Sequence, residues 1–151
     1  MYKRGLTVSV TVALLTLSLI VPAVLAQGIE ERKVTVELSG IAAPKGSLHE
    51  TVDVELTVCL TAVGVNGRRG RLNLDEGTLQ LRGEVLTATG GKGLAGRFRG
   101  RGAMVLYMVG DGWAARILLR PAGQGHIIGF ATIRLEEQLY LAILEGNLTF
   151  Q

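Results

Sequence analysis

The stretch from Gly96 to Arg120 constrains the fold more than any other part of the sequence. Apolar residues alternate with other residues on both sides of Gly110-Asp111-Gly112, a pattern typical of β-strands. An Asp-Gly pair supplies the positive φ angles that a tight hairpin turn requires. The stretch therefore predicts a β-hairpin with Asp111 and Gly112 in its turn.

This turn fixes the register of the hairpin, because the two strands pair outward from it. The pairs predicted for one face are entirely apolar: Met104 with Leu119, Leu106 with Ile117 and Met108 with Ala115. The pairs predicted for the other face are Val105 with Leu118, Tyr107 with Arg116 and Ala103 with Arg120. We expect the first face to join the core and the second to face solvent.

Arginines gather on the second face of this hairpin. If the first strand extends back through Arg101, Arg99 and Arg97, their alternate spacing places all three guanidinium groups on one side. The candidate ligand-binding residues are Arg97, Arg99, Arg101, Tyr107, Arg116 and Arg120. Such a row suits an anionic ligand, such as a sulfated glycan, a phosphate-bearing lipid or an acidic polymer. The alternative is a solvated strand whose arginines discourage pairing with other chains.

Residues 1–26 have the layout of a secretory signal peptide. Lys3 and Arg4 precede an apolar run from Leu6 to Val21, and small residues follow as far as Ala26. We expect cleavage after Ala26 and one mature all-β domain, residues 27–151, that is secreted or held at the cell surface. The alternative is an uncleaved membrane anchor, since about 20 apolar residues can span a bilayer.

Export changes the charge balance of the protein. The full chain has 16 basic and 13 acidic residues, a net charge of +3. Without Lys3 and Arg4 the balance is 14 against 13, a net charge of +1. The positive charge concentrates between Gly64 and Arg120, where ten basic residues outnumber four acidic ones. This segregation can steer an anionic partner, or it can be neutralised by the acidic flanks of the same chain.

Cys59 is the only cysteine, so an intramolecular disulfide is impossible. A domain of about 125 residues buries roughly two thirds of its surface on folding and needs no such bond. We expect a buried thiol, and the alternative is a link to another chain.

The remaining mature sequence also has the pattern of β-strands and no helical periodicity. Further strands are predicted at 33–38, 50–62, 71–74, 78–87, 126–135 and 139–150. A turn is predicted at Asp75-Glu76-Gly77, between the third and fourth of these strands. About eight antiparallel strands with short turns indicate an up-and-down β-barrel, with a two-sheet sandwich as the alternative. Pairing of the first strand near Val36 with the last near Leu148 distinguishes the barrel.

The C-terminal hairpin is apolar on both faces. A three-residue turn at Glu136-Glu137-Gln138 pairs Leu135 with Leu139 and places Phe130 against Leu144. A large apolar surface of this kind is rarely left exposed, so we expect an assembly contact or a ligand there. The candidate interface residues are Phe130, Tyr140, Leu144 and Leu148.

Chemical motifs are scarce in this chain. It contains no glycine-rich phosphate loop, nucleophile elbow or metal-ligand cluster, and no cofactor is predicted. His126 is a remote candidate for a general base beside Asp53 or Glu145. Asp53 and Glu55 share a strand face, which a solvated strand explains better than a cation site. Asn147-Leu148-Thr149 matches the glycosylation acceptor pattern.

These observations favour an exported, non-enzymatic β-domain that acts as a structural or interaction protein of the cell surface and self-associates through its C-terminal sheet. The alternative is a secreted binding protein for an anionic or amphipathic ligand, held at the arginine face or in a barrel lumen. A small enzyme using His126 is a remote alternative. Nucleic acid is a poorer partner because the domain is exported, and the membrane is expected to be contacted only through an uncleaved signal segment.

Overall fold

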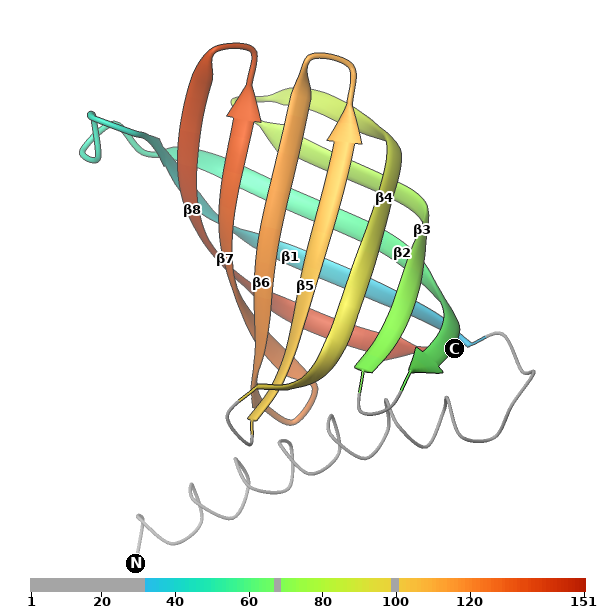
Figure 1. The fold of residues 1–151 in the computed structure, drawn as a ribbon. Helices are drawn as coiled ribbons and strands as arrows, with labels where there is room; N and C mark the ends of the chain where they lie inside the picture. Colours follow the sequence, from blue (N-terminus) through green and yellow to red (C-terminus); the bar gives the residue numbers. More distant parts are fainter. Residues whose placement is uncertain (1–31, 67–68, 99–100) are drawn as a thin grey trace, which may run out of the picture.

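In the computed structural model, which describes residues 32–66, 69–98 and 101–151, the strands form a closed β-barrel. They are β1 (Lys33–Pro44), β2 (Val52–Asn66), β3 (Arg69–Leu81), β4 (Glu84–Phe98), β5 (Arg101–Gly110), β6 (Trp113–Gly123), β7 (His126–Leu135) and β8 (Gln138–Phe150). Each strand pairs with the next one along the chain, and β8 returns to pair with β1 (Figure 1). The predicted signal peptide and Arg99 lie outside the described residues.

The closure between β1 and β8 decides between the two predicted folds. Val36 pairs with Leu148, so the up-and-down barrel is confirmed and the sandwich is wrong. Two glycines permit this closure. A Cβ atom at Gly40 would overlap the carbonyl oxygen of Ile143, and one at Gly146 would overlap the carbonyl oxygen of Glu37. The two strands therefore approach more closely than any larger residue allows at these positions.

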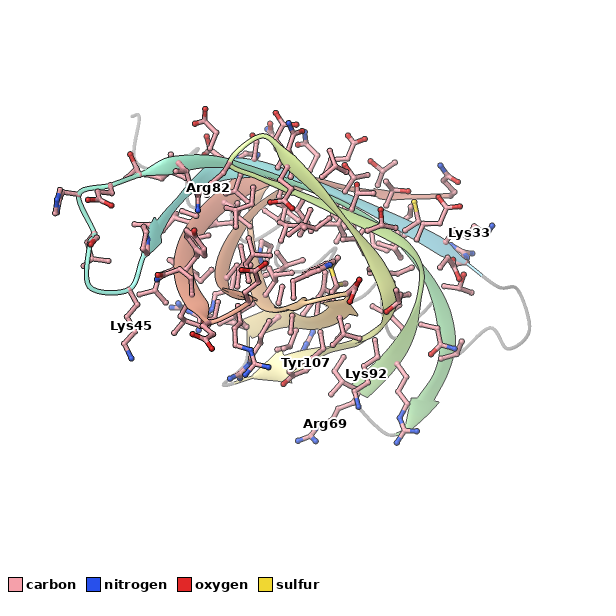
Figure 2. All side chains as sticks on the ribbon, turned by 90° about the horizontal axis from the view of Figure 1, so that it is seen from above. Lys33, Lys45, Arg69, Arg82, Lys92 and Tyr107 are labelled. Carbon is pink, nitrogen blue, oxygen red and sulfur yellow. The ribbon has the colours of Figure 1, made fainter. Side chains whose placement is uncertain are left out.

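Alternate residues of every strand point into the barrel, and Figure 2 shows their side chains inside the ring of strands. The largest of them are almost completely buried: Leu56, Leu60, Leu79, Leu81, Leu106, Met108, Ile117, Leu119, Ile127, Ile133 and Leu144. Burial of each such side chain contributes about 1.5 to 3 kcal/mol to folding.

Among the described residues, no helix is long and apolar enough to cross a membrane.

The hairpin predicted around Asp111 has the expected register. Met104 pairs with Leu119, and Tyr107 pairs with Arg116. Gly112 has a φ of 73°, which favours glycine. The apolar face of this hairpin lies inside the barrel and the arginine face lies outside.

The turn predicted at Asp75-Glu76-Gly77 is wrong. β3 continues through these residues, and Asp75 is the extra residue of a β-bulge, because Cys59 pairs with Glu76 and Leu60 with Leu74. Gly77 is closely packed, since a Cβ atom would lie 2.8 Å from the terminal methyl carbon of Met108, and that side chain would have to shift. The chain turns instead at Arg82-Gly83, where φ is 57° and 77°.

The register predicted for the C-terminal hairpin is wrong by one residue. Leu135 pairs with Gln138, so the turn has two residues and Phe130 lies against Ile143. A shift of one residue exchanges the two faces of a strand. Of the predicted interface residues, Tyr140, Leu144 and Leu148 are consequently buried inside the barrel. Phe130 alone of the four lies on the outer face.

The ends of the barrel differ. Figure 1 shows the β1–β2 loop and the β3–β4, β5–β6 and β7–β8 turns at one end of the barrel. The start of β1 and the end of β8 lie at the other end. At the first end, Arg82 donates a hydrogen bond from Nη1 to the hydroxyl oxygen of Tyr140, at 3.0 Å. This bond is the main cause of a raised pKa for Arg82.

Candidate functional site

The outer wall of β3, β4, β5 and β6 is hollowed near the end where β4 passes to β5. The hollow encloses about 710 Å³. It is lined by Arg69, Leu94, Ala95, Gly96, Arg97, Arg101, Gly102, Ala103, Val105, Arg116, Leu118 and Arg120. We refer to it as the arginine hollow.

Small residues create the depression. Gly96 pairs with Ala103 at its centre, so little side-chain volume rises from the sheet there. Next to this pair, Leu94 lies against Val105 and Val105 lies against Leu118. The floor of the hollow is therefore apolar.

Arginines from all four strands surround this floor. Arg69 comes from β3, Arg97 from β4, Arg101 from β5, and Arg116 and Arg120 from β6. Figure 2 shows Arg69 on the same side of the barrel as Lys92 and Tyr107. Because the strands are hydrogen-bonded neighbours, residues distant in the sequence converge here.

The predicted neutralisation of these arginines by the acidic flanks is absent from the described part of the chain. No described carboxylate forms an ion pair within 4.0 Å of an arginine of the hollow. Acidic residues lie elsewhere on the barrel surface: Glu37 on β1, Asp53 and Glu55 on β2, and Asp75 and Glu76 on β3. Glu145 on β8 pairs with Ile128, which pairs with Arg120, but it does not line the hollow.

One arginine of the hollow is oriented by an aromatic ring. The guanidinium carbon of Arg116 lies 5.9 Å from the ring centroid of Tyr107, a cation–π distance. Tyr107 stands on the outer face, as predicted, but does not line the hollow. It positions Arg116 from one side.

The predicted row of arginines along a single strand is wrong. β4 ends at Phe98 and β5 begins at Arg101, so the row is divided between two strands. Arg97 of β4 pairs with Gly102 of β5, and Arg101 pairs with Phe98. Arg97 and Arg101 therefore belong to two neighbouring strands and opposite sides of the pleat, yet both line the end of the hollow.

A second hollow lies on the outer wall of β7, β8 and β1. It encloses about 430 Å³ and is lined by Ile41, Ala42, Ala43, Leu48, Thr51, Phe130, Ala131, Thr132, Leu141, Ala142 and Ile143. Its exposed side chains are large and apolar: the exposed fraction is 50% for Phe130 and 59% for Ile143. We refer to it as the apolar hollow.

The remaining predicted residues lie outside both hollows. His126 Nε2 is 3.7 Å from a carboxylate oxygen of Glu145 on the outer wall. Cys59 is half-buried, with Sγ 3.9 Å from Thr35 Oγ1. Asn147 is exposed on β8. Within the part of the chain that the structure describes, no cluster of three His, Cys, Asp or Glu residues suits a metal ion.

The chain matches no protein-family model, no curated protein and no solved structure. Its function is therefore inferred from the geometry of its own residues.

Proposed function

We propose that this protein is an exported binding protein that holds an anionic ligand in the arginine hollow. The observation that carries the proposal is the convergence of five arginines from four strands on one apolar depression, without a described carboxylate partner. Export is inferred from the N-terminal sequence.

The electrostatics of the hollow support this role. Guanidinium groups stay protonated at every physiological pH, so the hollow is permanently positive. Like charges held close together repel, and an anion bound between them removes that repulsion. A planar guanidinium group also offers paired donors to phosphate or carboxylate oxygens.

The outer wall is a better binding surface than the lumen. The inward-facing side chains are buried against one another, and a Cβ atom at Gly93 would lie 2.9 Å from a side-chain carbon of Leu106. Interiors of small barrels are commonly filled in this way. We therefore place the ligand outside the barrel.

The test is retention on immobilised heparin, used as a sulfated polyanion, together with its affinity for the free protein by isothermal titration calorimetry. Replacement of Arg101, Arg116 and Arg120 by glutamine should weaken heparin binding at least tenfold, because three charge-assisted contacts are lost.

The control replaces Lys33, Lys45 and Arg134 by glutamine. These exposed residues lie outside the hollow, and the change in net charge is the same. We expect less than a twofold loss. Equal losses in the two variants would show that heparin responds to net charge alone, and the proposed site would be abandoned.

Self-association is a second candidate function, favoured by the apolar hollow. Phe130, Ile143 and Ile41 lie side by side there, and each is about half exposed. Light scattering on the wild type and on Ile143→Glu tests it. A dimer that the substitution dissociates would support association, and a monomeric wild type would exclude it.

A further inference from the structure

One row of outward side chains joins the two hollows. Successive cross-strand pairs connect Leu94, Val105, Leu118, Phe130, Ile143 and Ile41, from β4 to β1. Every member of this row is apolar. We refer to it as the apolar row.

The surroundings of the apolar row change along its length. On β5 and β6 it runs between Arg116 on one side and Arg120 on the other, within the arginine hollow. On β7 and β8 its neighbours in the apolar hollow are Thr132 and Leu141. The row is therefore flanked by two arginines at one end. At the other end its neighbours are Thr132 and Leu141 on one side, and Ile128 and the carboxylate of Glu145 on the other.

We propose that the ligand is a single-chain anionic amphiphile. Its anionic group binds among Arg101, Arg116 and Arg120, and its alkyl tail follows Leu118, Phe130 and Ile143 into the apolar hollow. This inference depends on the proposed function of the arginine hollow and adds the chemical class of the ligand.

The dimensions of the wall fit such a ligand. Neighbouring strands lie about 4.8 Å apart, so the three spacings from β5 to β8 cover roughly 14 Å. An alkyl chain of medium length spans this distance. Hydrophobic contact along the row then adds to the attraction between the head group and the arginines.

The curvature of the barrel favours a flexible chain over a flat surface. Three of the eight strand spacings separate β5 from β8, which is more than a quarter of the circumference. When one hollow touches a planar bilayer, the barrel wall therefore curves away from the bilayer at the other hollow. A polyanion would use the arginines and leave the apolar hollow unoccupied.

The experiment measures binding of octyl phosphate, butyl phosphate, inorganic phosphate and 1-octanol by calorimetry, below the micelle concentration. Each methylene that contacts the row should raise the affinity about fourfold. We therefore expect octyl phosphate to bind at least tenfold more tightly than butyl phosphate. Octanol, which has no anionic group, should bind more weakly than octyl phosphate.

Two variants locate the tail. Phe130→Ser and Ile143→Thr should each weaken octyl phosphate binding at least fivefold and leave butyl phosphate binding unchanged. Val85→Thr is the matched control, because Val85 is 62% exposed and lies outside the row. All three positions are on the outer wall, and thermal melting followed by the near-ultraviolet signal of Trp113 verifies that each variant is folded.

Three outcomes separate the two proposals. If Arg101, Arg116 and Arg120 are needed but octyl and butyl phosphate bind equally, the tail site is refuted while the arginine hollow stands. If the arginine substitutions change the binding of neither the alkyl phosphates nor heparin, the proposed function is refuted, and the tail site is refuted with it. If Ile143→Thr dissociates a dimer and octyl phosphate leaves that dimer intact, a second copy occupies the apolar hollow and the tail site is refuted.

Discussion

The two faces of the β5–β6 hairpin show how this barrel divides its tasks. On the inner face, Leu106 and Ile117 are each 1% exposed and pack against the core. On the outer face, the paired residues Tyr107 and Arg116 contact each other and solvent. The same two strands thus stabilise the fold through buried side chains on one face and present a candidate binding surface on the other. Substitutions should therefore affect stability or binding according to the face they alter.

The largest effect is expected where the inner face has no room for a side chain. Gly40→Val places a Cβ atom against the backbone of Ile143 and Leu144, and neither strand can move without opening the barrel. We expect a loss of more than about 5 kcal/mol, which is most of the stability of a typical domain. Urea denaturation measures it.

Gly90→Val is the control, because a Cβ atom there meets a side-chain carbon of Val109 at 3.7 Å, an ordinary contact distance. It should change the free energy of unfolding by less than about 1 kcal/mol. A folded Gly40→Val variant of normal stability would mean that β1 and β8 do not close as described.

The next effect compares one substitution on the two faces. Leu106→Ala removes a buried side chain and should cost about 2 to 5 kcal/mol. Leu94→Ala removes a side chain that is 42% exposed and should cost less than about 1 kcal/mol. The two residues lie on neighbouring strands, and equal losses in chemical denaturation would contradict the assignment of inner and outer faces.

Two hairpins explain how far the sequence predicts this fold. Asp111-Gly112 is a common hairpin turn, so its register and the faces of β5 and β6 were predicted correctly. In the β7–β8 turn the residue with positive φ is Glu136, at 55°. Glutamate rarely adopts positive φ, so the sequence gives no sign of where this turn lies. The resulting error of one residue exchanged the faces of β8 and placed Tyr140 in a surface where the structure has Leu141 and Ile143.

The candidate site was predictable in part. Arg97, Arg101, Arg116 and Arg120 were among the predicted residues, and all four line the hollow. Arg69 and Leu94 were missed because they reach the site through the pairing of β3, β4 and β5, which local alternation does not specify. Ending one strand at Phe98 and beginning the next at Arg101 would have brought Leu94 opposite Val105.

A smaller effect is expected where the inner face meets solvent. Tyr140→Phe removes the hydroxyl that accepts the hydrogen bond from Arg82 and should lower the melting temperature slightly. This bond raises the pKa of Arg82. Its contribution to the free energy of unfolding is therefore fully present below the pKa of Arg82 in the unfolded chain, and it is lost only in strong alkali. The difference in melting temperature should therefore be constant between about pH 5 and 9. A difference that varied across this range would assign the effect to another group.

The smallest effect is expected on the outer face, and its sign carries information. Arg120 lies in a cluster of arginines without a described carboxylate partner, so Arg120→Gln should raise the free energy of unfolding by up to about 0.5 kcal/mol at low salt. Added salt shortens the screening length from about 10 Å at 0.1 M to about 3 Å at 1 M, so the gain should fall with salt and disappear near 1 M. Arg134→Gln, outside both hollows, should show no such gain in the same melting experiments. A loss of stability in Arg120→Gln would mean that the arginines support the fold. A gain would mean that the ligand-free barrel tolerates an electrostatic cost on its outer face, as a surface selected for binding an anion requires.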